Sequence, residues 1–329
     1  MANYSLLLGV ISAAFLLTSC APLPHDPKET YILVAANIKI PYWQTALTGL
    51  NHAAAEMKVK AAMFGPATYD INAERDELRR AIQQKPSGIM VSAADAKLLT
   101  ADINSALQQG IPVITVDADA PDSKRLFFVG TDNYNAGRLG GELLVKLLNG
   151  KGNVVVFTYP NQTNLTERLH GYESVLSGYP GVKVNHAVDI KGDPTVAFDT
   201  AKQLIDTKAK VDAFVCLEAV ACPEIGDVVN RASMNPKPKI IAMDTDQRTL
   251  TWIQKGVISA TIAQRPYTMT YFGEKVLDDL HHHPPASLTE NFANRSFSPL
   301  PTFIDTGTFI VDSSNTAAFM QENQAHGQQ

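Results

Sequence analysis

The sequence predicts an α/β protein made of two doubly wound, parallel-sheet lobes. Short apolar runs alternate with amphipathic helical segments from Tyr31 onward, and such alternation is typical of parallel sheets with helices on both faces. The pattern contains more units than one sheet of usual width accommodates, and it restarts near Asn133. The run 111–116 (IPVITV) consists mostly of branched apolar residues, as expected for a strand buried on both faces.

The first half of the pattern supplies five strands and three helices, assigned from the spacing of apolar residues. The strands are expected at 31–36, 59–64, 88–91, 111–116 and 125–129. The helices are expected at 42–58, 72–84 and 96–109. Gly110 can take the left-handed conformation that ends the last of these helices.

The second half repeats the pattern. Its strands are expected at 153–157, 182–188, 212–217, 239–242 and 259–263. Its helices are expected at 135–148, 165–176, 195–206, 224–232, 248–254 and 268–280. An irregular stretch follows at 291–301, then one strand at 303–311 and a polar tail at 321–329.

The composition fits a globular protein of two domains. The chain has 329 residues, of which 45% are hydrophobic and 19% charged, which is enough for two substantial cores. A net charge of −5 provides no electrostatic footprint for nucleic acid, so that class of partner is not expected.

The N-terminus is predicted to be a targeting segment rather than part of a domain. The apolar run 6–17 is too short to remain as a membrane-spanning helix. The LTSC sequence at 17–20 resembles a bacterial lipoprotein signal, which implies removal of residues 1–19 and lipidation of Cys20. Residues 20–30 then form a Pro-rich tether to the membrane. Residues 1–5 contain no Lys or Arg, a departure from that pattern, and an ordinary secretory signal is the alternative. Either kind of signal places the folded part of the chain outside the cytoplasm, in the periplasm or cell envelope.

Two other sets of residues have open interpretations. Cys216 and Cys222 are six residues apart, and in an exported chain they form either a disulfide or two buried thiols. The three histidines at 281–283 could bind a metal ion, but a polar helix end is the favoured interpretation, because the helix dipole favours cations there. Neither a metal nor a cofactor is therefore expected.

Asp117 and Asp119 follow the buried strand 111–116 directly. Ligands of open parallel sheets bind outside the carboxyl ends of the strands, so these carboxylates are candidates for ligand contact. Loop solvation or helix capping is the alternative, because Asp is a common turn residue.

Six motifs in order make the chain resemble the periplasmic sugar-binding proteins of the ribose/galactose-binding type, the type I substrate-binding proteins of ABC importers. The motifs are IPYW (40–43), GIPVITVDAD (110–119), VGTDNYNAGRLGG (129–141), RLHGY (168–172), MDTD (243–246) and ISATIAQRPY (258–267). The resemblance implies two lobes joined by a three-stranded hinge, with crossings near 130–133, 263–264 and 303–308. It places 31–130 plus 264–302 in the N-terminal lobe and 131–263 plus 303–320 in the C-terminal lobe.

The resemblance also implies a set of ligand contacts, matched position by position. Tyr42 and Trp43 match the aromatic pair that stacks on a sugar ring, while Asp117, Asp244 and Gln264 match its hydroxyl-binding groups. The complete set of expected contacts is Tyr42, Trp43, Asp117, Asp119, Arg168, Thr166, Glu218, Asp244 and Gln264.

The chain departs from the ribose-binding pattern at several positions. Ile40 replaces an Asn, so Asn37 or Lys39 would have to supply that contact. Gly192 lies near the place of a second stacking aromatic, and Glu218 replaces an Asn or Asp. The pattern's ligand Arg corresponds to position 166, so the second-lobe contact comes either from Arg168 or from Asn164 and Thr166. These differences predict that the ligand is not ribose bound in the ribose manner. A polyhydroxylated or amino-bearing ligand is expected instead.

The function that the resemblance implies is that of a monomeric, lipid-anchored solute-binding protein. It would bind a small sugar or sugar-like polyol between its lobes and deliver it to an ABC transporter permease. A receptor subunit for a sensor kinase or chemoreceptor is the alternative. An enzyme is not expected, because the sequence contains no phosphate-binding Gly-rich loop and no nucleophile elbow.

Overall fold

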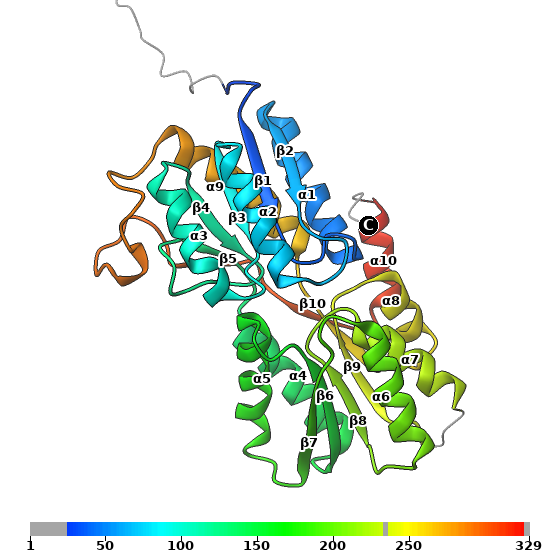
Figure 1. Cartoon of the computed structure of the whole chain (residues 1–329). Coiled ribbons are helices and arrows are strands. Elements are labelled where there is room, and N and C mark those ends of the chain that lie inside the picture. Colours follow the sequence, from blue (N-terminus) through cyan, green and yellow to red (C-terminus); the bar gives the residue numbers. More distant parts are fainter. Residues whose placement is uncertain (1–24, 233–235, 326–329) are drawn as a thin grey trace, which may run out of the picture.

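The computed structural model describes residues 25–232 and 236–325, and it contains two six-stranded sheets, one in each lobe (Figure 1). The first sheet has the strand order β11-β5-β4-β3-β1-β2, and the second has the order β12-β10-β9-β8-β6-β7. All pairs are parallel except β10 and β12, which are antiparallel. The expected α/β class with two doubly wound lobes is therefore confirmed. The signal segment and Cys20 lie outside the described residues.

The first lobe is formed mainly by the N-terminal part of the chain. Its strands are β1 (Thr30–Val34), β2 (Lys60–Phe64), β3 (Gly88–Val91), β4 (Val113–Val116), β5 (Phe128–Gly130) and β11 (Phe303–Asp305). Its helices are α1 (Pro41–Met57), α2 (Ile71–Gln83), α3 (Ala96–Gln108), α9 (Pro266–His282) and the 3₁₀ turn η1 (Phe292–Asn294).

The second lobe follows the first crossing. Its strands are β6 (Gly152–Thr158), β7 (Val182–Asp189), β8 (Ala213–Cys216), β9 (Lys239–Met243), β10 (Ala260–Ala263) and β12 (Phe309–Asp312). Its helices are α4 (Asn133–Leu148), α5 (Thr163–Leu176), α6 (Pro194–Asp206), α7 (Ala221–Arg231), α8 (Gln247–Gln254) and α10 (Thr316–Ala325).

Local sequence signals fix where many helices begin. The carboxylates of Asp70, Asp95, Asp132, Asp193 and Asp246 each accept a hydrogen bond from a backbone N–H in the first turn of the helix that follows. Such caps satisfy donors that a helix leaves unpaired. α1, α6 and α9 begin with a proline, whose fixed φ angle suits the first helical position.

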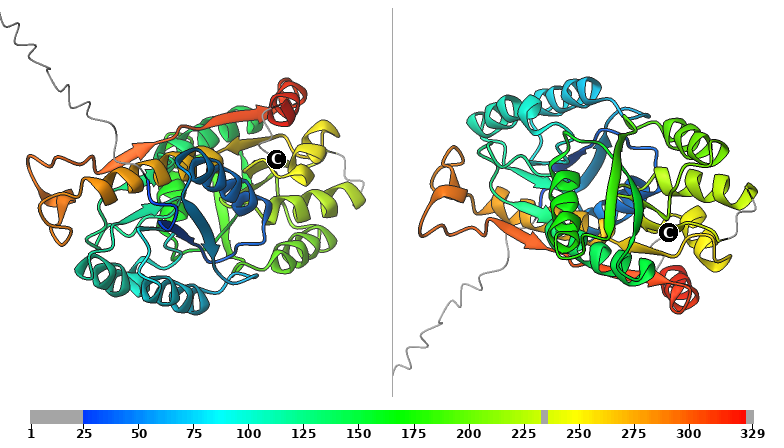
Figure 2. Two further views of the ribbon diagram at one scale, coloured as in Figure 1. Left: turned by 90° about the horizontal axis from the view of Figure 1, so that it is seen from above. Right: turned by 90° about the horizontal axis from the view of Figure 1, so that it is seen from below.

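Each sheet lies between two layers of helices, as the two views in Figure 2 show. In the first lobe α1 packs on α9, and α2 packs on α3. In the second lobe α4 packs on α5, while α6, α7 and α8 pack in sequence. The inner strands β1, β3, β4, β8, β9 and β10 are almost fully buried, whereas the edge strands β2 and β7 are partly exposed. The inner strands therefore carry the cores of both lobes.

Three chain segments connect the lobes. They run from β5 to α4, from β10 to α9, and from β11 to β12. The expected single strand at 303–311 is wrong, because Gly307 interrupts it with a φ of 80°. β11 pairs with β5 in the first sheet and β12 pairs with β10 in the second. Residues 303–305 thus lie in the first sheet, not in the C-terminal lobe as expected.

The expected tail also differs from the structure. Residues 321–325 belong to α10 rather than to an irregular tail, and 326–329 lie outside the described residues. α10 packs against α8 and β12 of the second lobe. Ring contact between Phe309 and Phe319, with centroids 5.6 Å apart, fixes the helix on that strand.

Cys216 and Cys222 form a disulfide with a Cα–Cα distance of 5.8 Å, which decides between the two alternatives for these residues. The bridge joins the end of β8 to the first turn of α7. It therefore closes the short loop 217–221, which carries Glu218.

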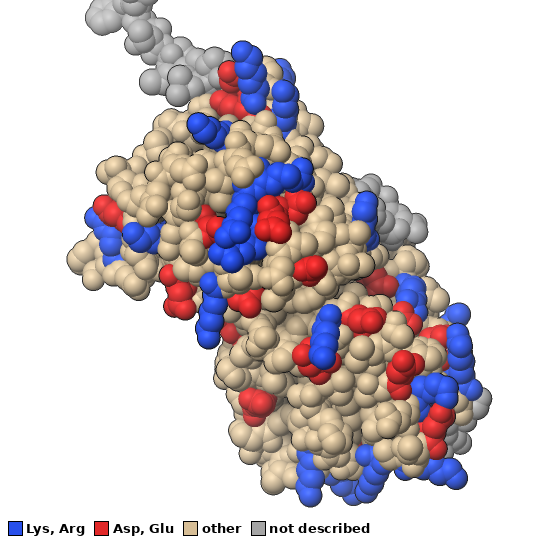
Figure 3. Space-filling view, viewed as in Figure 1, with Lys and Arg blue, Asp and Glu red and all other residues tan. Residues whose placement is uncertain are grey.

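The surface has two further properties relevant to function. Acidic and basic side chains are interspersed on the face shown in Figure 3 rather than gathered by sign. No helix within the described ranges is long and apolar enough to span a bilayer.

Candidate ligand-binding site

Asp117 and Asp244 occupy equivalent positions in the two lobes. Asp117 follows β4 and Asp244 follows β9, and both are central strands of their sheets. Both residues have a left-handed backbone, with φ angles of 65° and 67°, a conformation that Asp tolerates better than most residues. Both are more than nine-tenths buried. The same local geometry thus brings one carboxylate from each lobe to the space between them.

Asp117 is held by two hydroxyl groups of its own lobe. The Tyr42 hydroxyl, from the first turn of α1, donates to Oδ1 at 2.6 Å. The Ser92 hydroxyl, directly after β3, donates to Oδ2 at 3.2 Å. These bonds fix the orientation of the carboxylate, and each oxygen retains further capacity to accept hydrogen bonds.

Asp244 is connected to Arg168 through an amide. Gln264 Nε2 donates to Asp244 Oδ1 at 2.9 Å, while Gln264 Oε1 accepts from Arg168 Nη2 at 3.2 Å. The guanidinium is 2% exposed and also donates to Asn133 Oδ1 and to the Leu217 carbonyl. A fixed cation on α5 therefore faces acids from both lobes.

Glu218 adds a third carboxylate, at the end of β8. It accepts from the backbone N–H groups of Val220 and Ala221 at 2.6 and 3.1 Å and from the Tyr159 hydroxyl at 3.2 Å. Val220 and Ala221 lie in the loop closed by the disulfide, so the covalent bridge and the polar contacts together restrain the position of this carboxylate.

Aromatic rings from both lobes lie around the charged groups. Tyr69, between β2 and α2, and Tyr159, directly after β6, have ring centroids 4.9 Å apart. Gly192 makes this arrangement possible, because a Cβ atom there would lie 2.3 Å from Tyr69. Tyr42 and Trp43 pack edge to face with centroids 5.2 Å apart.

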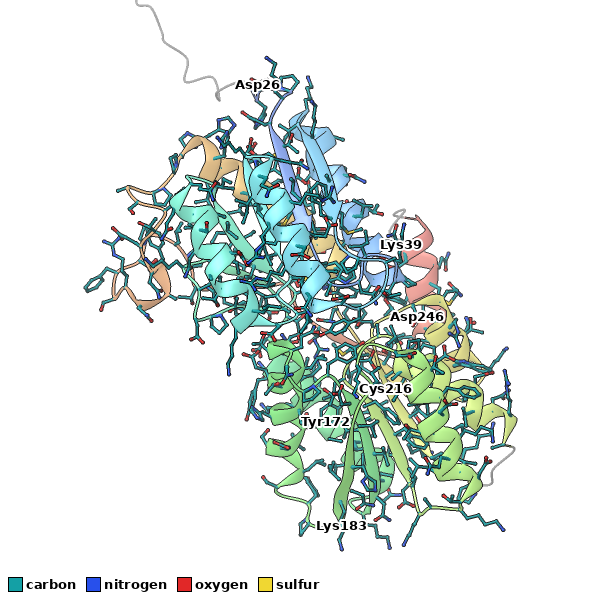
Figure 4. All side chains as sticks on the ribbon, in the orientation of Figure 1. Asp26, Lys39, Tyr172, Lys183, Cys216 and Asp246 are labelled. Carbon is teal, nitrogen blue, oxygen red and sulfur yellow. A yellow bond between two sulfur atoms is a disulfide. The ribbon has the colours of Figure 1, made fainter. Side chains whose placement is uncertain are left out.

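These groups enclose a cavity of about 70 Å³ between the lobes. At roughly 10–15 Å³ for each water-sized group, it has room for about five to seven such groups. It shares Tyr42, Asp244 and Gln264 with a wider pocket of about 420 Å³. In Figure 4 the labelled Asp246 lies close to the junction between the lobes, and Lys39 lies above it at the side of the first lobe. We place the site in the smaller cavity, since it combines Asp117 of one lobe with Arg168 of the other.

Burial dominates the electrostatics of the three carboxyl groups. Burial raises the pKa of Asp244 to about 7, although the nearby charge of Arg168 and the Gln264 amide lower it. Burial likewise raises the pKa of Glu218 to about 7, against its backbone hydrogen bonds. The pKa of Asp117 is also raised by burial, while Tyr42 and Arg168 act in the opposite direction. These carboxyl groups have lost hydrogen bonds to water on burial. Hydroxyl groups of a bound ligand can donate hydrogen bonds in place of that water.

A family model described as a periplasmic binding protein domain matches residues 31–282. The chain belongs to this family. The sugar-binding protein of a sugar ABC transporter from Bacillus halodurans, a crystal structure, is 36% identical with a TM-score of 0.75, and the match covers 89% of this chain and 100% of that one. AraP, an arabinose-binding protein from Geobacillus stearothermophilus, is 32% identical with a TM-score of 0.73 over 89% and 99%. The ribose import binding protein RbsB of Bacillus subtilis (strain 168) is 23% identical over 281 residues, 82% of this chain and 90% of that protein.

In this periplasmic binding protein, seven of the nine expected contact residues line the cavity. They are Tyr42, Trp43, Asp117, Arg168, Glu218, Asp244 and Gln264. Of the alternatives for the second-lobe contact, Arg168 and Asn164 line the cavity. Thr166 does not, because its hydroxyl donates to the carbonyls of Pro160 and Gln162.

Asp119 also lies outside the cavity of this periplasmic binding protein. Its carboxylate forms a bidentate ion pair with Arg125, with both N–O distances 2.6 Å, and accepts from the Thr115 hydroxyl at 2.5 Å. The expectation of a ligand contact there is corrected, because these partners already occupy the carboxylate. The backbone carbonyl of Asp119 instead accepts from Thr163 of the other lobe at 2.9 Å.

Several cavity residues of the periplasmic binding protein were not expected from the sequence. They are Tyr69, Ser92, Tyr159 and Gln162. Ser92 directly follows the predicted strand 88–91, so the rule that found Asp117 could have found it. Tyr159 directly follows the observed strand β6, which is one residue longer than the predicted strand 153–157 at this end. Asn37, rather than the exposed Lys39, lines the cavity near Ile40. The Asn37 side-chain oxygen is buried and has no hydrogen-bond partner among the described residues.

Proposed function

We propose that this protein binds a small sugar or sugar-like polyol between its lobes and delivers it to the permease of an ABC importer. The observation that carries the proposal is the pair Asp117 and Asp244, one from each lobe, facing one cavity with Arg168 and Gln264 beside them. Carboxylates, an amide and a guanidinium are the groups that accept from and donate to several hydroxyls at once. Tyr and Trp faces suit the CH surface of a sugar ring.

The size of the cavity excludes an oligosaccharide. A volume of about 70 Å³, at roughly 10–15 Å³ for each water-sized group, holds part of one monosaccharide, and in this proposal the rest of the ring extends toward the wider pocket that shares Tyr42, Asp244 and Gln264. The names of the relatives, which bind arabinose or import ribose, support the same class. Position 40 and the acid at 218 set this chain apart from the ribose-binding pattern, so we expect a different sugar or a different mode of binding.

The proposed mechanism is closure of the lobes around the ligand. A sugar that contacts Asp117 and Asp244 together binds the closed arrangement better than an open one, and this difference shifts the population toward closure. The three short crossings between the lobes are the hinge in this proposal. Contacts between lobes, such as Thr163 with Asp119 and Tyr69 with Tyr159, stabilise the closed arrangement.

We further propose that the protein acts outside the cytoplasm as a monomer held by a lipid on Cys20. The LTSC sequence at 17–20 and the Pro-rich segment after it support this proposal. The mass of the N-terminal peptide from the native membrane fraction tests it, because lipidation adds acyl chains to Cys20. An unmodified peptide that begins elsewhere would contradict the anchor but leave ligand binding untouched.

The function is tested by identifying the ligand. Mass spectrometry of small molecules released on denaturation, followed by calorimetric titration with pentoses, hexoses and their polyols, should find one tight ligand. Micromolar affinity corresponds to about −8 kcal/mol, within reach of several charged hydrogen bonds and one ring stack. Loss of uptake of that ligand in a deletion strain would support transport. Uptake that persists, with loss of a transcriptional or chemotactic response, would instead favour a receptor subunit. No binding across the panel contradicts both.

Sugar affinity is expected to rise with pH. Asp244 and Glu218 have pKa values of about 7 in the ligand-free protein, and the ionised carboxylates are the better hydroxyl acceptors. We expect at least about tenfold weaker binding at pH 6 than at pH 8, since each proton that must leave contributes up to a factor of ten per unit. Calorimetry across this range checks the result, and a flat profile would contradict it.

The stability of the ligand-free protein is expected to fall as the pH rises, in contrast to the sugar affinity. The folded-state pKa values of Asp244 and Glu218 lie above those of the unfolded chain, so the folded state binds more protons between about pH 4 and 7. The contribution of these groups to stability is therefore lost as the pH rises through 7. Chemical denaturation without ligand, at the same pH values, separates this effect from binding.

A further inference from the structure

Four potential metal ligands meet at the end of the first lobe that lies away from the cavity. His25 and Glu29 precede β1, while Asp278 and His282 lie one turn apart near the end of α9. One ligand atom from each of the four lies within 4.8 Å of all the others. Asp26, the neighbour of His25, is labelled in Figure 4 at the end of the lobe opposite the junction. The cluster and the ligand cavity are therefore separate sites.

Three of the four candidate ligand atoms in this cluster are buried and have no hydrogen-bond partner in the part of the chain that the structure describes. His25 Nδ1, Glu29 Oε2 and His282 Nε2 make no hydrogen bond to any residue of 25–232 or 236–325. The Glu29 and Asp278 side chains are only 10% and 9% exposed. Buried polar atoms without partners are costly and rare, so three of them within 4.8 Å of one another suggest an occupant.

We propose that these four side chains bind one Zn²⁺ ion. Ligand atoms about 2.1 Å from zinc at the corners of a tetrahedron lie about 3.4 Å apart. The structure has His25 Nδ1 at 3.2 Å from Asp278 Oδ1. It also has His282 Nε2 at 3.4 Å from Glu29 Oε2 and 3.7 Å from Asp278 Oδ1.

The chemistry of the ligands agrees with the geometry. Two carboxylates and two neutral imidazoles carry a total charge of −2, which neutralises one divalent ion. Nitrogen ligands favour zinc over calcium or magnesium, because those two ions prefer oxygen. Tyr31, in the buried strand β1, donates its hydroxyl to Asp278 Oδ1 at 2.9 Å. Such a bond is the usual support for a ligating carboxylate.

The site connects two parts of the chain that are far apart in sequence. It fixes the segment entering β1 to the C-terminal end of α9. The competing explanation is that protonated His25 and His282 form ion pairs with the same carboxylates, with no metal. Zinc titration distinguishes the two, because a proton-bridged cluster does not bind zinc in a saturable manner at one site.

The test is calorimetric titration of ZnCl₂ into the untagged protein after treatment with EDTA. We expect one zinc per chain, a higher melting temperature with zinc, and at least about tenfold weaker binding in His25→Ala and His282→Ala. His283→Ala is the matched control, because His283 follows directly on α9 but its side chain is 68% exposed and forms its ion pair with Asp279, outside the cluster. It should bind zinc within about twofold of the parent protein.

Two results would overturn the proposal. One is the absence of saturable zinc binding at micromolar concentrations. The other is an equal loss of affinity in His283→Ala and in His25→Ala, which would indicate binding by surface histidines. His25 lies before the first strand, so His25→Ala keeps the test valid even if His282→Ala impairs folding. The proposed sugar function is not involved, because sugar affinity is expected to be the same with and without zinc.

Discussion

We expect Asp244→Asn to weaken sugar binding by at least about a hundredfold. The carboxylate faces the cavity opposite Asp117 of the other lobe, and hydrogen bonds to a charged group contribute about 1.5–3 kcal/mol each. Loss of two such bonds corresponds to about 3–6 kcal/mol, or a factor of a hundred or more. Asparagine is chosen over alanine because the backbone at 244 is left-handed, with a φ of 67°, which Asn tolerates.

The control for this prediction is Asp199→Asn. Asp199 is exposed on α6 and does not line the cavity. Calorimetry with the identified ligand should give parental affinity for this variant, and thermal melts should show that both variants fold cooperatively. Affinity of Asp244→Asn within about threefold of the parent would amount to less than 1 kcal/mol and would remove Asp244 from the site.

We expect Arg168→Met to lower the stability of the protein and to weaken sugar binding. The guanidinium is buried and donates to Asn133, to the Leu217 carbonyl and to Gln264. Methionine keeps the apolar stem but leaves these acceptors without a donor and the nearby acids without a cation. Loss of one member of a buried charged network destabilises by about 3–5 kcal/mol. The pKa of Asp244 should rise further, since Arg168 holds it down.

Urea denaturation measures the stability loss, and calorimetry below the reduced melting temperature measures the affinity. Arg138→Met is the matched control, because Arg138 is 46% exposed on α4 and pairs with Glu142 one turn away. Exposed pairs of this kind contribute about 0.3–0.5 kcal/mol. If Arg168→Met were as stable as Arg138→Met, the guanidinium would not be the central charge of the site.

Most of the fold is accessible from the sequence because its signals are local. The buried strands are short runs of branched apolar residues, and most helices begin at Asp caps or prolines, α5 and α7 being exceptions. The division of 303–311 into β11 and β12 was not accessible, because it depends on pairing with β5 and β10. Those partners lie far away in sequence, and the apolar pattern of FIDTGTFIV is compatible with one strand.

Site residues could be predicted where they follow a strand directly. They could not be predicted where contacts with residues distant in sequence determine whether a side chain faces the cavity. Asp117 is found by that rule and Asp244 by the family resemblance, whereas Asp119 turns away because Arg125 binds it. Tyr69 lies in a loop between β2 and α2, and only the packing of the two lobes shows that it fills the space beside Gly192. The histidines at 281–283 likewise could not be assigned a role from the sequence. The partners of His282, namely His25 and Glu29, are about 250 residues earlier in the chain.

The left-handed backbone shared by Asp117 and Asp244 places a limit on how stable this protein can become. An ordinary L-residue in that conformation costs about 1–2 kcal/mol, which glycine avoids. Glycine at the ends of β4 and β9 would remove this backbone cost, while the proposed ligand recognition requires a carboxylate there. The two demands compete at the same two backbone positions, once in each lobe. A more thermostable relative that keeps the same ligand would have to gain its stability elsewhere in the sheets.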